Sequence, residues 1–127
     1  MTNLRIDKIK STKIPKGWGW EEVLINTVNF CGKILHYNKA NSISSYHFHH
    51  DKREYFRCVN GSFILREKDG SGYDHETLLK VGDSVYIPNS VPHQLISLED
   101  NSEIYEISTF HDDGDVVRIS PGDSQKI

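Results

Sequence analysis

Short stretches in which apolar and polar residues alternate follow one another through most of this chain, and no other feature constrains its fold as strongly. Each stretch is rich in β-branched and aromatic residues and has the length of a strand, about four to eight residues. No stretch carries a helical period long enough to predict an amphipathic helix. Strands are therefore predicted at residues 21–27, 31–38, 42–49, 54–60, 62–68, 76–81, 83–88, 93–99 and 102–109.

Turn-forming residues separate these stretches at intervals of about eight to twelve residues, the spacing of β-sandwiches and closed β-barrels. The strongest turn signal is the pair Asn60 and Gly61, because Asn-Gly readily takes the two positive φ angles of a type I′ hairpin turn. The sequence therefore predicts an all-β fold, either a sandwich or a closed barrel, that limits the number of exposed strand edges.

The size and charge of the chain restrict its class. Its 127 residues predict one domain, residues 1–127, with a barrel core at about residues 20–110 and a peripheral N-terminal arm and C-terminal tail. The formal net charge of −3 argues against a nucleic-acid-binding face, which needs clustered Lys and Arg. The five basic residues among the first sixteen are expected to form a solvated arm.

Cysteine content and hydropathy indicate the compartment. Cys31 and Cys58 are the only cysteines, too few for a disulfide framework, and the polar residues at 1–13 lack the apolar core of a secretory signal. No run approaches the ~18 apolar residues of a membrane helix. We therefore expect a cytoplasmic protein without a membrane partner, in which both thiols are small buried groups rather than nucleophiles.

Three of the seven histidines lie within the four residues HFHH at 47–50. Residues two apart on a strand point to the same face, so His47 and His49 can reach one metal ion. Glu54 begins the next predicted strand after a short polar turn, and His93 follows a proline-bounded turn. Three imidazoles and one carboxylate suit a divalent transition metal and leave about two positions for substrate or water. The alternative is that these histidines lie on the surface or are satisfied within the core.

The spacing of these residues resembles the two sequence motifs of the cupin superfamily. H-x-H-x4-E-x6-G over residues 47–61 is similar to the first motif, and G-x5-P-x4-H over residues 82–93 is similar to the second. The resemblance covers about residues 30–110. It implies a double-stranded β-helix, also called a jelly-roll barrel, that carries a divalent Zn, Mn, Fe, Ni or Co ion on the four residues named above.

Two positions depart from the second motif. Ser90 stands where the motif usually has Gly, and Ser97 where it often has Asn. Serine suits position 90 if the backbone there avoids positive φ, and otherwise the turn that directs His93 would be altered. Position 97 is not a metal ligand in the family, so the four-ligand assignment stands.

A narrower resemblance lies at residues 15–50. The segment PKGWGWEEVLIN, followed by CGKILHYNKANSISSYHFHH, is similar to the region that precedes the histidine motif in type II mannose-6-phosphate isomerase cupins. His47 and Tyr55 stand where that group commonly has Gln and His. The resemblance implies a sugar or sugar-phosphate substrate. It also implies a homodimer paired through the sheets, for which the aromatic segment GWGWEE is a candidate contact.

Metal-dependent chemistry on a small molecule follows from these resemblances. Our leading hypothesis is an isomerase-like reaction, in which the metal polarises a carbonyl and a general base moves a proton between neighbouring carbons. The candidate catalytic residues are Tyr37, His36, Arg66 and Tyr105, all on predicted strands. Two alternatives stay open: an Fe(II) cupin dioxygenase, and a cupin that binds a small metabolite without catalysis.

The residues that line the barrel discriminate between these hypotheses. Basic groups would indicate a phosphate or carboxylate substrate, and an apolar bore an oxygenase or lyase substrate. Strand alternation predicts a mostly small and apolar lining, with a charged clamp only if Lys33, Arg57 or Arg66 turns inward. His75 and His111 lie in polar turns and are expected on the surface. The residues predicted to share the ligands' face are Ile43, Ser45, Phe56, Cys58, Leu95 and Ser97.

Overall fold

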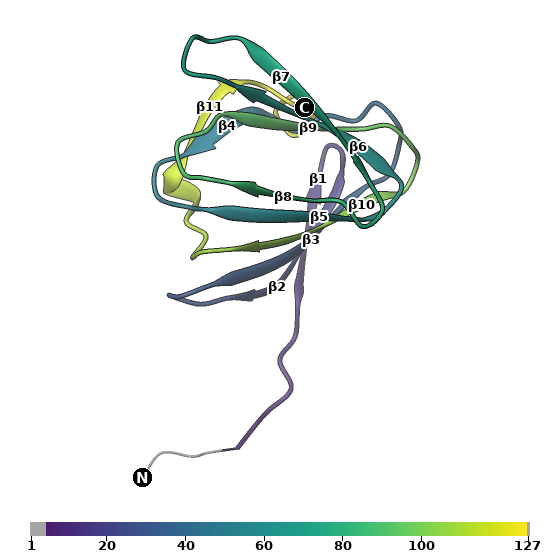
Figure 1. Ribbon diagram of the computed structural model, residues 1–127. Coiled ribbons are helices and arrows are strands. Elements are labelled where there is room, and N and C mark those ends of the chain that lie inside the picture. The colour runs from purple at the N-terminus through teal and green to yellow at the C-terminus, as the bar shows by residue number, and fades with distance from the viewer. Residues whose placement is uncertain (1–4, 127) are drawn as a thin grey trace.

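Two antiparallel sheets that face each other make up the protein (Figure 1). The computed structural model describes residues 5–126. One sheet contains β1 (Thr12–Lys16), β2 (Gly19–Asn26), β3 (Cys31–Tyr37), β10 (Ser102–Ser108), β5 (Glu54–Asn60) and β8 (Ser84–Ile87), in that spatial order. The other contains β11 (Val116–Ser120), β4 (Tyr46–His49), β9 (His93–Ser97), β6 (Ser62–Lys68) and β7 (Asp74–Lys80), in that order. Two short 3-10 turns, η1 (Asp113–Asp115) and η2 (Asp123–Gln125), flank β11.

The core lies between the two sheets because each strand turns alternate side chains inward. On β3, for example, the side chains of Cys31, Lys33, Leu35 and Tyr37 are buried, and those between them are only half-buried. The chain is nearly all β, and its two packed antiparallel sheets are the predicted jelly-roll barrel. The buried core residues are Trp18, Leu35, Tyr37, Phe56, Cys58, Phe63, Leu65, Leu79, Ile87, Leu95 and Ile104.

A hairpin joins β5 to β6 at the predicted place, but its turn differs from the prediction. Gly61 has a φ of 66°, whereas Asn60 is not among the residues with positive φ, so the turn is not type I′. Asn60 stays in β5 and pairs with Glu103 of β10. A Cβ at position 61 would lie 2.1 Å from Ser102 Oγ, so both the backbone angle and the close approach require glycine.

Segments expected to be a solvated arm and a peripheral tail form the edge strand of each sheet. β1 pairs with β2 from Thr12, opposite Val23, to Lys16, opposite Gly19. β11 pairs with β4, so that Arg118 lies opposite His47. The C-terminal segment therefore adjoins β4, the strand that carries two of the predicted metal ligands.

Within residues 5–126 no helix is long enough to cross a membrane.

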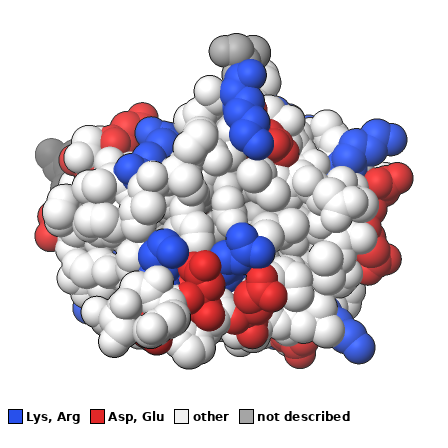
Figure 2. Space-filling model, turned by 90° about the horizontal axis from the view of Figure 1, so that it is seen from above, with Lys and Arg blue, Asp and Glu red and all other residues white. Residues whose placement is uncertain are grey.

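Ion pairs join β6 and β7 across the strand pair. Arg66 contacts Glu76 at 2.9 Å, and Lys68 contacts Asp74 at 3.0 Å, in the register of the two strands. Figure 2 shows one face of the molecule, on which basic and acidic side chains lie beside one another within a wide uncharged surface. On exposed strands such pairs contribute at most about 1 kcal/mol each.

Candidate metal centre

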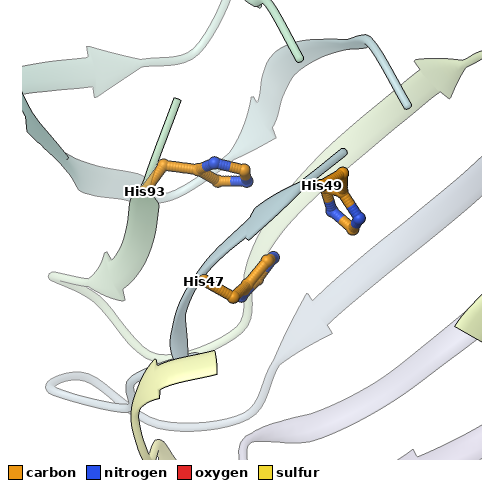
Figure 3. A group of neighbouring side chains, drawn as sticks. All are labelled: His47, His49 and His93. Carbon is orange, nitrogen blue, oxygen red and sulfur yellow. The ribbon is translucent and has the colours of Figure 1, made fainter. Parts of the chain in front are cut away.

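Three histidines converge at one end of the five-stranded sheet. His47 and His49 lie on the same face of β4, and His93 begins β9 directly opposite His47. One ring nitrogen of each lies within 4.8 Å of those of the other two. Figure 3 shows the three rings turned toward one common space. This separation matches three ligands of a single metal ion, since Zn–N and similar bonds are about 2.0–2.1 Å long.

Glu54 approaches this group from the opposite sheet, at the start of β5. Its Oε1 atom lies 3.2 Å from His49 Nε2 and 3.1 Å from His93 Nε2. His49, Glu54 and His93 are each at most 4% exposed. The structure therefore brings together all four residues that the motif spacing predicts as ligands.

Hydrogen bonds on the far side of two rings fix their orientation. His93 Nδ1 lies 2.9 Å from the carbonyl oxygen of Val91, and His47 Nδ1 lies 3.0 Å from that of Ser45. A carbonyl oxygen only accepts hydrogen bonds, so each Nδ1 carries the proton and each Nε2 presents a lone pair. Metal-bound histidines commonly have this arrangement.

Several buried polar atoms of the group lack a hydrogen-bond partner within the described chain, namely Glu54 Oε1, His93 Nε2 and His49 Nδ1. Such atoms are costly to bury unless a ligand satisfies them. Nitrogen and carboxylate donors together are also the set that Zn, Mn, Fe, Ni and Co ions accept. The three-histidine group could therefore hold a divalent metal, and Glu54 is placed to add a carboxylate.

The ionisation of these side chains suits a cation. Burial raises the pKa of Glu54, but contacts with His49, His93 and Lys52 outweigh it and hold this pKa well below its usual range. Burial and the neighbouring His93 lower the pKa of His47 to about 3. Burial lowers the pKa of His93, but contact with Glu54 outweighs it and raises this pKa above its ordinary value. Ligands must be an ionised carboxylate and neutral imidazoles, which Glu54 and His47 already are near neutral pH.

A cavity of about 140 Å³ adjoins the histidines. Part of its wall is apolar: Trp18 stacks on Tyr37 with ring centroids 4.2 Å apart, and Phe56 and Leu95 also line it. The rest of the wall is charged, which corrects the mostly apolar lining that strand alternation predicts. The charged lining residues include Lys16, Glu21, Lys33, Lys52, Glu106 and Arg118.

Lys52 connects the metal ligands to this charged wall. Its Nζ atom lies 3.6 Å from Glu54 Oε2, 2.7 Å from Glu106 Oε2 and 3.1 Å from His111 Nδ1. His111 in turn lies 2.8 Å from Asp113. His111 therefore lines the cavity and is not the surface residue that its polar turn suggests. Burial and the nearby Lys52 lower the pKa of His111.

A second set of ion pairs lies farther along the six-stranded sheet. Lys33, which is 3% exposed, pairs with Glu21, and Lys16 lies 3.4 Å from the same carboxylate. The inward position of Lys33 could be found from its alternation with Cys31 on the predicted strand. Lys52 offered no such signal, because it lies in a turn where no periodicity orients the side chain.

Of the four candidate catalytic residues, Tyr37 alone is placed at the cavity within the described residues. Its ring is 1% exposed, and burial raises its pKa. His36 points to the other face of β3, where it stacks on Trp20 and contacts Glu103 at 2.8 Å. Inward and outward positions alternate on a strand, so these neighbours cannot both face the cavity.

Arg66 and Tyr105 also lie away from the cavity. Arg66 is held by Glu76 on the face of β6 opposite the core residues Phe63 and Leu65. Tyr105 is 45% exposed on the outer face of β10. Of the four candidates, Tyr37 is therefore the one whose side chain faces the cavity.

The two serines that depart from the motif have different roles. Ser90 has a φ of 67°, so the condition under which serine would suit this position is not met. Its N–H donates to the carbonyl of His49 at 2.7 Å. This bond ties the turn before His93 to β4. Ser97 is fully buried. Its hydroxyl donates to Lys39 O at 2.6 Å and accepts from Ser42 N at 3.0 Å, so it fastens the preceding loop to β9.

Comparison with known proteins agrees with this geometry. The model of the family described as Cupin domain matches residues 34–105, more than half of the chain. The chain belongs to the cupin family. No curated protein matches this cupin.

Solved structures of oxalate decarboxylase from Bacillus subtilis resemble this cupin in fold. The structure at pH 4.6 has a TM-score of 0.76 and 17% sequence identity over 86% of this chain and 30% of that chain. A tryptophan-to-phenylalanine variant of that enzyme has a TM-score of 0.76 and 18% sequence identity, over the same 86% of this chain and 30% of that chain. A structure from a study of the Mn(II) centres of that enzyme has a TM-score of 0.73 and 16% sequence identity. This cupin thus spans about 30% of the length of that enzyme, and the narrower resemblance to mannose-6-phosphate isomerases stays a prediction.

Proposed function

We propose that this cupin is a metal-dependent enzyme that acts on a small, oxygen-bearing molecule, with the metal held by His47, His49, Glu54 and His93. The observation that carries the proposal is the pair of buried atoms Glu54 Oε1 and His93 Nε2, which lie 3.1 Å apart beside a cavity and lack a hydrogen-bond partner within the described residues. A bound divalent ion would act as a Lewis acid on a substrate oxygen.

An isomerase-like proton transfer fits the cavity better than oxygenation, because the wall beside the histidines is charged. Glu106, 4% exposed, lines the cavity, and its Oε2 atom lies 2.7 Å from Lys52 Nζ. In this proposal Glu106 takes a proton from the hydroxyl-bearing carbon beside the carbonyl and returns it to the carbonyl carbon, while the hydroxyl proton passes to the former carbonyl oxygen. These shifts balance, so the substrate is rearranged without gaining or losing an atom.

The remaining lining residues would bind and shield the substrate. Trp18 and Tyr37 form a stacked aromatic wall that excludes water from one side of the cavity. Lys52 holds Glu106 at 2.7 Å and thereby fixes the position of the proton-transferring carboxylate. Sugars and sugar phosphates fit this description and are the substrate class that we propose.

Elemental analysis of the purified protein tests the metal. We expect about one divalent ion per chain in wild type and none in His49→Ala or Glu54→Ala, with the fold retained by circular dichroism. His75→Ala is the matched control, because the exposed side chain of His75 on β7 pairs with Asp69, away from the cavity. A wild-type protein that neither carries nor titrates a metal would contradict the proposal and favour a non-catalytic binding cupin.

Activity assays then separate the two enzyme classes. Aldose–ketose interconversion that is lost in Glu106→Gln, while the metal is retained, supports the isomerase. Oxygen uptake with Fe(II) bound, and no interconversion, would instead support the Fe(II) dioxygenase. Both assays use the metal-loaded protein, so a failure to bind metal is recognised separately.

We also infer that the protein is a cytoplasmic homodimer. Both cysteines are buried and unpaired, which suits a reducing compartment. Exposed apolar side chains on the outer face of the six-stranded sheet include Tyr86, Tyr105 and Ile107, and apolar patches of this kind mark protein contacts. The aromatic segment at 17–22 contributes less than its sequence suggests, because Trp18 is buried in the core.

A further inference from the structure

Charged side chains cross the inner face of the six-stranded sheet in alternating sign. Each comes from a neighbouring strand or from the turn before β5, and Glu106 on β10 lies directly opposite Lys33 on β3. We call this set the charged row. Burying so many charges is unfavourable unless each is paired. The pairing of each charge therefore indicates which groups could still bind a ligand. Its members, in order from the metal ligands outward, are Glu54, Lys52, Glu106, Lys33, Glu21 and Lys16.

The two ends of the charged row have opposite excess charge. Near the histidines, one ammonium group, that of Lys52, is shared by the carboxylates of Glu54 and Glu106. At the other end, one carboxylate, that of Glu21, is shared by the ammonium groups of Lys33 and Lys16. The first end therefore suits a cation and the second end suits an anion.

The two buried lysines also differ in how many of their donors are used. An ammonium group has three N–H donors. Lys52 has three partners: Glu54, Glu106 and His111. Lys33 has a single ion-pair or hydrogen-bond partner among residues 5–126, namely Glu21. Because Lys33 also lines the cavity, it has donors left to offer to a ligand, whereas Lys52 already contacts three side chains.

Arg118 lines the same cavity from the five-stranded sheet. It lies on β11 opposite His47, and its side chain makes no ion pair or hydrogen bond with any residue that the structure describes. Its guanidinium group can bind a carboxylate or a phosphate through two parallel hydrogen bonds. Two cationic groups with unused donors thus border the cavity, one from each sheet.

We propose that Lys33 and Arg118 form an anion subsite for the substrate. The inference rests on the proposed function: the substrate would place oxygen atoms on the metal and a carboxylate or phosphate between Lys33 and Arg118, which line the same cavity. The substrate class is then a small polyhydroxy or keto compound with one anionic group, such as a sugar acid or a sugar phosphate.

Three-carbon probes test the subsite by calorimetry on the metal-loaded protein. Glycerol, glycerate and glycerol 3-phosphate share a diol and differ in the anionic group. We expect one anionic probe to bind at least about tenfold more tightly than glycerol, as charge-assisted hydrogen bonds do. The preferred probe identifies the anion as carboxylate or phosphate. Equal affinities for all three would overturn the proposal.

Variants assign the effect to the two residues. Arg118→Gln, at an exposed position, and Lys33→Met should each reduce the affinity for the preferred anion about tenfold or more and leave that for glycerol unchanged. Arg57→Gln, on the outer face of β5, is the matched control. Unchanged anion affinity in Arg118→Gln would contradict the subsite, even if Lys33→Met does not fold.

Metal content measured in the same samples separates the two proposals. If the variants keep the metal but lose the anion preference, both proposals are supported. If wild type binds no metal, the proposed function fails, and inorganic phosphate is titrated into the metal-free protein instead. Phosphate binding that is weakened in Arg118→Gln would still support the anion subsite, and its absence in wild type would overturn it.

Discussion

Ser90 has a backbone conformation that favours glycine. Its φ of 67° costs a residue with a Cβ about 1–2 kcal/mol, and glycine would regain this at the expense of about 0.5–1 kcal/mol of chain entropy. We therefore expect Ser90→Gly to raise the free energy of unfolding by about 0.5–1 kcal/mol. Chemical denaturation measures the change.

A second substitution at this position is the control. Ser90→Ala keeps a Cβ and should leave stability nearly unchanged, because no side-chain hydrogen bond of Ser90 occurs among the described residues. If Ser90→Gly were no more stable than Ser90→Ala, the positive φ at position 90 would not be destabilising the protein. The turn leads into His93, so the same variants also show whether strain there affects the metal affinity.

His47 makes the metal-free protein sensitive to acid. Its pKa is about 3 in the folded state and about 6.5 in an unfolded chain. Between these values the unfolded state binds the additional proton, so His47 lowers stability as pH falls below about 6.5. The slope is at most about 1.4 kcal/mol per pH unit.

Denaturation of the metal-free protein at pH 7 and pH 5 measures this effect. We expect wild type to lose more stability over this interval than His47→Gln, in which position 47 cannot take up a proton. Subtracting the two curves removes most of the contribution of His93, whose raised pKa acts in the opposite direction. Parallel curves for the two proteins would show that His47 is not held neutral by burial.

At the scale of elements, η1 holds the turn between β4 and β5. The carboxylate of Asp115 accepts hydrogen bonds from the backbone N–H groups of His50, Asp51 and Lys52 at 3.0–3.2 Å. This turn fixes the two strands that carry His47, His49 and Glu54. The segment expected to be a peripheral C-terminal tail therefore supports the candidate metal centre.

Removing this carboxylate should weaken the site. We expect Asp115→Ala to reduce the metal affinity about tenfold, a typical effect of losing a group that orients ligands, and to lower the free energy of unfolding by about 1–2 kcal/mol. Asp51→Ala is the control, because that side chain is exposed and makes no contact of its own within residues 5–126. Metal titration followed by calorimetry measures both proteins, and equal affinities would contradict a role for η1.

The sequence predicted the strands from β2 to β10 and missed the first and last strands, β1 and β11. β3, β5 and β10, for example, alternate between buried and more exposed positions, which is the pattern that reveals strands. β1 is exposed at four of its five positions and contains Pro15, and β11 is exposed at its last three. Such edge strands carry charges and proline that limit further pairing, so their sequences resemble loops.

The candidate site also contains residues that the sequence predicted and residues that it did not. His47, His49, Glu54 and His93 could be found because strand alternation and motif spacing orient them. Lys52 and His111 lie in irregular segments, and their positions depend on contacts with Glu106 and Asp113. No local pattern records such contacts, so the charged wall became visible only in the folded structure.

For the whole molecule, an apolar row on the outer face of the six-stranded sheet indicates the contact of the proposed homodimer. Ile107, Tyr55 and Tyr86 lie opposite one another on β10, β5 and β8. Ile107 is 59% exposed and Tyr86 62% exposed. A matching surface on a second copy would bury these side chains.

A charged side chain introduced into this apolar row should dissociate the proposed homodimer. We expect wild type to have the mass of a dimer by light scattering, and Ile107→Lys to have that of a monomer while keeping its metal. Ile119→Lys on β11 is the control, because Ile119 is similarly exposed on the other sheet. A monomeric wild type, or a dimer that is insensitive to Ile107→Lys, would contradict this contact.

The origin of the four donor side chains from opposite sheets has a consequence for the integrity of the barrel. Glu54 begins a strand of one sheet, and the three imidazoles belong to the other. A coordinated ion would cross-link the two layers at this end, opposing local opening between them. Chelation would then loosen the barrel at this end, so that metal release and cleavage by a protease near residues 50–53 would increase together.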